Sequence, residues 1–277
     1  MDKAKFSVKV SNAFAILILS GLSACLNIDV RAGSSTAGGS STREVYAALC
    51  KTSGEKIHRI VEDVDGIFLM KLRPEGTNFS DQYEPYDPYG NDLSGKGYII
   101  SFLKNHHNSG WDSFTTGPVG YSFVEALDPN DNKLYRYTGQ IKVTGRKDSA
   151  APAIQEYLRK DPKFDINNYG FVLEREWIPH RTARYGVNYK EISTRSHRDQ
   201  WIAGSALQIV DLDTNEVLAE RIGYMMDPGA GARAGGRSPW LIASRHACPS
   251  FGPNGSGHLN QAFNFTKKSL KPKLDRQ

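Results

Sequence analysis

The sequence is poor in cysteine and lacks the short motifs that mark common catalytic sites. Only three of its 277 residues are cysteine, and no CxxC pair occurs, which excludes a thioredoxin-like redox motif. None of the seven histidines belongs to an HExxH helix, and no serine lies in a GxSxG elbow. The sequence therefore predicts neither a metal site nor a cofactor.

The chain also lacks a strong excess of charge of either sign. The chain has 35 Lys and Arg against 30 Asp and Glu, a formal net charge of +5, and its only basic block lies at residues 267–277. This balance argues against nucleic acid as a partner. Hydrophobic residues make up 39% of the chain, and Tyr and Phe are frequent, which suits a globular fold rich in strand.

Residues 1–24 have the pattern of a secretion signal. Three lysines within the first nine residues precede the apolar run Ala13–Leu19, and small residues follow directly before Cys25. The run is too short for a transmembrane helix, which needs about 20 apolar residues. A buried first helix of the fold would need neither the lysines nor the small residues, so export is the favoured interpretation.

The four residues Leu22-Ser23-Ala24-Cys25 resemble the lipobox of bacterial lipoproteins. In that family the signal peptide is removed and the cysteine, now N-terminal, is diacylated. The resemblance, which covers the first 26 residues, implies a palmitate-bearing Cys25 that anchors the protein to a membrane. In that family an Asp directly after the cysteine favours the inner membrane. Here the residue is Leu26, so the resemblance favours the outer membrane of the cell envelope, on its periplasmic side or its surface.

Cys50 and Cys248 remain for the folded part of the chain. Two thiols in an oxidising compartment most simply form a disulfide, and we expect this pairing. The alternatives are two buried free cysteines or a reactive thiol.

The rest of the chain is expected to form one domain. Residues 25–41 are rich in Gly, Ser, Ala and Thr and predict a lipidated flexible tether. Residues 42–266 predict a single α+β domain, with a mainly antiparallel sheet and a few short helices. Residues 267–277 predict a basic, mobile tail.

Periodicity and turn signals place the elements of this domain. A capping box at Ser41–Glu44 predicts a helix to about Cys50, and Pro152 suits the first turn of another over 150–160. Strands are expected at 56–61 and 66–72, joined by an acidic turn at 62–65, and at 97–103, 121–127, 133–143, 169–177, 181–192, 207–210 and 217–226.

Two of the expected hairpin turns, Asp128–Asn132 and Asp211–Asn215, imitate calcium loops. Their sixth positions, which require Gly, are Lys133 and Glu216, and their twelfth positions are not Glu. The Asp and Asn residues are better explained as turn formers that hydrogen-bond their own backbone.

A Gly-rich segment at residues 229–237 suggests a phosphate loop but does not match one. Its spacing is not GxGxxG, no P-loop Lys follows, and Pro239 lies where a helix would start. We expect a mobile loop, in which Arg233 and Arg237 are candidates for binding an anionic group.

Tyr83, Tyr86 and Tyr89 recur every three residues, and Pro85 and Pro88 between them favour polyproline II. Because that helix has three residues per turn, the tyrosines would form one stripe. The stripe could be a binding ledge, or it could pack onto the sheet and hold the long loop 73–96 in place. Anchoring is favoured, because long loops in compact domains need such contacts.

These features favour a lipid-anchored envelope protein that is a non-catalytic binding or structural module. Its partners would be the membrane, through the lipid, and an envelope protein or glycan. The alternative is a hydrolase acting on envelope material, for which His180, His197 and Asp199 are the candidate residues.

The two interpretations of the tyrosine stripe predict different stabilities. If the rings are anchors, replacing all three tyrosines by Ala should lower the free energy of unfolding by about 3–5 kcal/mol for each buried ring. Thermal unfolding of the triple variant measures this loss. A melting temperature close to that of the parent would instead identify the stripe as a binding ledge.

Overall fold

The computed structural model describes residues 39–73, 75, 93–104, 120–232, 234, 240 and 242–273. All of them belong to the second of two units, residues 1–37 and 38–277. The elements are α1 Gly39–Thr52, β1 Gly54–Ile57, β2 Val61–Val64, β3 Gly66–Leu69, α2 Gly95–Ile100, β4 Phe123–Leu127, β5 Leu134–Arg146, α3 Pro152–Lys160, β6 Asn167–Trp177, β7 Tyr185–Glu191, α4 Arg195–Asp199, β8 Ile202–Asp211, β9 Glu216–Met226, η3 Ala243–His246, β10 Ala247–Cys248, η4 Pro253–His258, α5 Gln261–Ser269 and β11 Leu270–Pro272.

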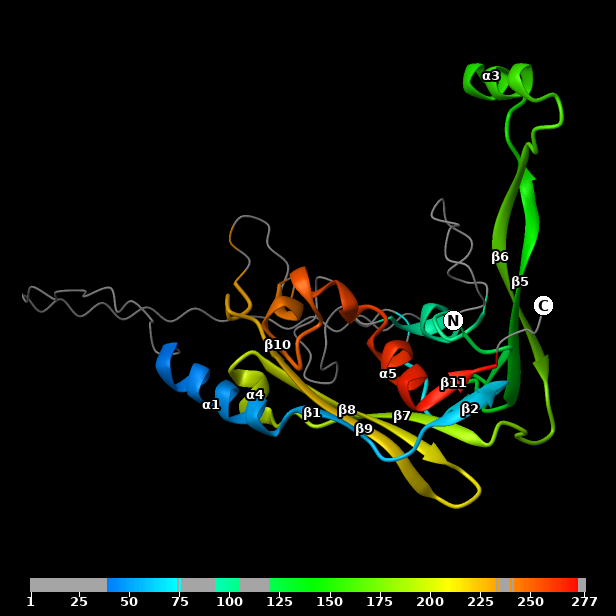
Figure 1. Ribbon diagram of the computed structural model, residues 1–277. Helices are drawn as coiled ribbons and strands as arrows, with labels where there is room; N and C mark the ends of the chain where they lie inside the picture. Colours follow the sequence, from blue (N-terminus) through cyan, green and yellow to red (C-terminus); the bar gives the residue numbers. More distant parts are fainter. Residues whose placement is uncertain are drawn as a thin grey trace, which may run out of the picture. The chain divides into compact units, whose positions relative to one another are not determined.

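A nine-stranded sheet organises the unit, and with the short helices it confirms the α+β class (Figure 1). Its strand order is β1-β9-β8-β7-β3-β4-β5-β6, and β10 also pairs with β9. Most neighbours are antiparallel, as expected, but β3 is parallel to both β4 and β7. The sheet is therefore mixed.

The helix α2 lies in the crossover between the parallel strands β3 and β4. The prediction of a strand at Gly97–Leu103 is therefore wrong. Its apolar residues Tyr98, Ile99, Phe102 and Leu103 are all buried, and their spacing of one, three and one matches one face of a helix. A short apolar run is compatible with the period of a strand and with that of a helix, and here the helical period is the correct one.

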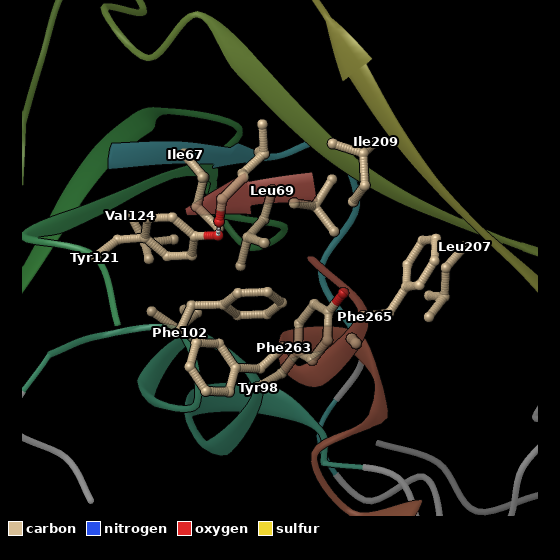
Figure 2. Packing of buried hydrophobic residues seen from close by; sticks show 14 of the residues in the cluster. Ile67, Leu69, Tyr98, Phe102, Tyr121, Val124, Leu207, Ile209, Phe263 and Phe265 are labelled. Carbon is tan, nitrogen blue, oxygen red and sulfur yellow. Dashed lines mark hydrogen bonds between the residues drawn. The ribbon is translucent and has the colours of Figure 1, made fainter. Parts of the chain in front are cut away.

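The core lies between one face of the sheet, which we call the inner face, and the helices α2 and α5 (Figure 2). Phe102, in the turn that follows α2, meets Phe263 of α5 edge to face, with ring centroids 6.0 Å apart. Ile67, Leu69 and Ile209 supply the sheet side and are almost fully buried. The Tyr121 hydroxyl donates a hydrogen bond to the Leu270 carbonyl (2.8 Å), which ties the C-terminal segment to the core.

The C-terminal segment is part of the fold. Residues 267–269 end α5, and β11 pairs in parallel with β2, so the prediction of a mobile tail is wrong as far as residue 273. The predicted acidic turn at 62–65 is wrong for the same reason, because three of its residues belong to β2. The strands β2 and β11, about 200 residues apart in the sequence, thus form a two-stranded sheet with each other. No local pattern reveals such a pairing.

Both expected hairpins are confirmed, as β4–β5 and β8–β9. The turn chemistry is confirmed too: Asp128 Oδ1 accepts the Asn130 amide (2.9 Å), and Asp211 Oδ1 accepts the Asp213 amide (3.2 Å). The predicted helix over 150–160 is α3, which connects the long strands β5 and β6 and lies at the end of their hairpin (Figure 1).

Helix α1 is fixed to the sheet by the predicted disulfide, which is confirmed between Cys50 and Cys248 of β10. The Tyr46 hydroxyl also donates a hydrogen bond to the His246 carbonyl (2.5 Å). The helix begins at Gly39, two residues before the predicted cap at Ser41. The folded unit therefore takes in the last residues of the expected tether.

The disulfide closes a loop spanning a sequence separation of 198 residues, so its loss should be costly. The chain-entropy model gives a stabilisation of about 5 kcal/mol for a loop of this size. Urea unfolding of the Cys50→Ser/Cys248→Ser variant should show a decrease approaching this value. Alkylation of the unreduced, denatured parent should label neither cysteine, and full labelling without reductant would contradict the bridge.

Candidate functional site

A cavity of about 700 Å³ opens on the inner face, where the sheet ends at β5 and β6. Four parts of the chain line it: Leu72, Arg73 and Glu75 after β3, the first turns of α2, the β4–β5 turn at 128–130, and residues of β5 and β6. The crossover between β3 and β4 therefore supplies one wall and the β4–β5–β6 meander supplies the other.

The cavity has a buried base and a charged rim. Ile99, Tyr137 and Arg73 are each at most 5% exposed. Burial raises the pKa of the Tyr137 hydroxyl, and the nearby Asp128 charge adds to the shift. The hydroxyl therefore stays protonated near neutral pH and can donate a hydrogen bond to a ligand.

Three cations, Arg73, Lys96 and Arg175, and two carboxylates, Glu75 and Asp128, share the lining. Glu174 also belongs to the lining, but its carboxylate pairs with Lys142 on the other face of the β5–β6 hairpin. One pair spans the cavity wall, where Arg175 Nη1 lies 2.8 Å from Asp128 Oδ2 and its guanidinium stacks on Tyr135, 4.6 Å from the ring centroid. With charges of both signs and an excess of only one cation, the lining has little net charge to select a polyanion. It suits a ligand that offers both donors and acceptors.

Behind the base lies a buried group of cations and aromatic rings. The Arg73 guanidinium stacks on Tyr189, 4.5 Å from the ring centroid. Arg221 donates a hydrogen bond to Gln261 Oε1 (3.2 Å) and lies 5.0 Å from the centroid of Phe251. Burial first, then the charges of Arg73 and Arg221, lower the pKa of His258 to about 3. His258 is therefore neutral in the folded protein at neutral pH.

The long loop that carries the tyrosine stripe leaves and rejoins the described chain at this cavity. Glu75 precedes the stripe and Gly95 follows it, and both line the cavity. Tyr83, Tyr86 and Tyr89 themselves lie outside the described residues, as do Arg233, Arg237 and Cys25.

The hydrolase candidates are not brought together. His180 precedes β7, whereas His197 and Asp199 belong to α4 beyond its other end, so a strand about 23 Å long separates them. His197 Nδ1 accepts the Thr194 amide (3.2 Å) in a capping box, and Asp199 pairs with Arg195 (2.9 Å). These side chains stabilise a short helix and do not form a triad.

The Gly-rich segment packs against an indole ring. Gly231 has a left-handed backbone (φ 73°), and a Cβ there would lie 1.8 Å from the Trp201 ring. Asp227 accepts the amides of Gly229 (3.2 Å) and Gly231 (3.0 Å). The glycines at the start of the segment thus let the backbone lie close to Trp201, which is a packing role.

Sequence reasoning identified Asp128 only as a turn former and did not identify Tyr137, Arg175 or Arg73. Alternation along β5 and β6 could have placed Tyr137 and Arg175 on one face, since they are paired in the ladder. Nothing local indicates that Leu72, Arg73, Glu75 and α2 form the opposite wall.

Comparison with known protein families, curated proteins and solved structures finds no match to this chain. In the described ranges no three His, Cys, Asp or Glu side chains are grouped to hold a metal ion. No helix among the same residues has the length and apolarity to cross a membrane. The candidate site therefore rests on the cavity itself.

The neutral, buried His258 predicts a loss of stability in acid. Between pH 6.5 and about 3 the unfolded chain binds a proton at this position that the folded chain does not, so the free energy of unfolding falls as pH falls. The full effect is on the order of 5 kcal/mol. His258→Gln should flatten this pH dependence, measured by urea unfolding at several pH values. The control His180→Gln changes an exposed histidine and should keep the parent's slope; a parental slope in His258→Gln would contradict the assignment.

Proposed function

We propose that the protein is a lipid-anchored component of the bacterial cell envelope, with the outer membrane favoured, and that its folded unit is a non-catalytic binding module. The lipobox-like residues Leu22–Cys25 carry the first part of this proposal. The disulfide between Cys50 and Cys248 supports it independently, because such bridges persist in oxidising compartments outside the cytoplasm.

The cavity beneath α2 supports the second part. It combines a buried base, a rim of both charge signs and a volume in the range of ligand sites. Its best-placed charged pair, Asp128 and Arg175, is held by mutual contact at 2.8 Å and by stacking on Tyr135. A paired and stacked arginine is suited to orient a ligand.

Labelling with palmitate tests the anchor. The parent should incorporate the label and fractionate with membranes, because two or more acyl chains anchor stably. Cys25→Ser should incorporate none and leave an uncleaved or soluble precursor. The matched control Cys50→Ser/Cys248→Ser removes the other two cysteines and should label like the parent. Unchanged labelling and fractionation of Cys25→Ser would overturn the proposed anchor.

A further inference from the structure

The two edges of the nine-stranded sheet are protected to different degrees. Strand β1 at one edge has only four residues, two of them charged. Strand β6 at the other edge has eleven, and its first seven, Asn167–Leu173, include no charge and no proline. Short length, charge and proline are the devices by which proteins prevent strand addition at an edge. The first part of β6, Asn167–Leu173, has none of them, whereas its last four residues, Glu174–Trp177, include three charges, so a segment that adds there must carry complementary charges.

The hydrogen-bond ladder shows which backbone groups of β6 face away from β5. The Ile178 amide donates to the Leu134 carbonyl (3.0 Å), and the register between β5 and β6 is unbroken from there to Tyr169. Hydrogen-bonded pairs alternate along an antiparallel ladder. Glu174 and Glu176 therefore bond to β5, whereas Leu173, Arg175 and Trp177 direct their N–H and C=O groups outward. Within the described part of the chain no strand pairs with this side of β6.

The same residues connect this edge to the cavity. Leu173 and Arg175 line the cavity with their side chains, opposite Ile99 and Lys96 of α2. The cavity is thus bounded by a helix on one side and by an edge strand on the other. A segment added to β6 would place alternate side chains toward the cavity, as in strand-addition sites where backbone bonds give affinity and side-chain pockets give specificity.

We propose that the partner of this module is a protein, and that an extended segment of it binds as an additional strand on β6 beside the cavity. This inference rests on the proposed binding function and names its partner class. The cross-strand neighbours define the segment: apolar side chains beside Leu173 and Trp177, a polar or acidic one beside Arg175, and a basic one on the other face beside Glu176. Trp177, 57% exposed, is the apolar residue that such a segment would cover.

A peptide library tests the proposal on the full-length lipidated protein in detergent. Random peptides of about twelve residues, long enough to span β6, are selected by phage display and their affinities measured by calorimetry. Selected peptides should alternate apolar and polar residues. Leu173→Pro removes one outward amide and no ladder bond, so it should bind them roughly tenfold more weakly than the matched control Leu173→Ala.

Amide exchange gives a second measurement that needs no variant. A bound peptide should protect the amides of Leu173 and Arg175, whereas those of Glu174 and Glu176 are already bonded to β5. This result decides the question if Leu173→Pro proves to be unfolded by circular dichroism.

Three outcomes would overturn strand addition. Peptides that bind Leu173→Pro and Leu173→Ala equally would show recognition by side chains alone. If the protein binds no peptide but binds envelope oligosaccharides in a glycan array screened alongside the library, it would still be a binding module, but its ligand would be a glycan. Concentration-dependent dimers that Leu173→Pro abolishes would identify a second copy of this chain as the occupant of the edge. Palmitate labelling is independent of all three, and only the absence of both peptide and glycan binding would count against the binding module itself.

Discussion

The parallel pairing of β3 with both of its neighbours is the constraint on which the rest of the structure depends. Parallel strands cannot be joined by a tight turn, so the chain must cross over one face of the sheet between them. The crossover from β3 to β4 carries α2 and the turn after it, where Phe102 meets Phe263 of α5 in the aromatic core. It also carries Leu72 and Arg73, which form a wall of the cavity. Without this crossover neither the core nor the cavity would exist.

Buried carboxylates hold the connections around the sheet. Glu125 on β4 is fully buried; burial alone would raise its pKa, but hydrogen bonds from the Ala183 amide, Arg136 and Thr182 lower it. Asp211, at the end of β8, is also fully buried, and the hydrogen bond from Arg184, with that from Arg59, lowers its pKa to about 2. Each carboxylate thus stays charged and fixes a loop to a strand. Removing one partner of such a buried ion pair lowers the stability of the fold more than replacing both partners by apolar residues, because it leaves a buried charge without a partner.

The cavity and the open edge of β6 are consequences of the same geometry. The inner face of the β5–β6 hairpin continues beyond the helices that cover the core, so Val143 and Tyr169, a cross-strand pair, are about half exposed. A hairpin stabilised mainly by its own ladder leaves backbone and side chains accessible near its base. That is where α2 comes close enough to form the second wall.

The sequence by itself determined what depends on neighbouring residues. It identified both antiparallel hairpins, because Asp and Asn turn formers separate alternating segments, and it identified α3 from Pro152 and the apolar spacing that follows. It also identified the cysteine pair, because only two thiols remain beside Cys25. Tertiary structure decided what depends on distant residues. In the run Gly97–Leu103, the residues as far as Ile100 are helical because the β3–β4 crossover packs them on the sheet. Residues 267–273 become ordered because β11 pairs with β2. The cavity belongs to this second group, since its walls come from segments whose proximity only the folded chain creates.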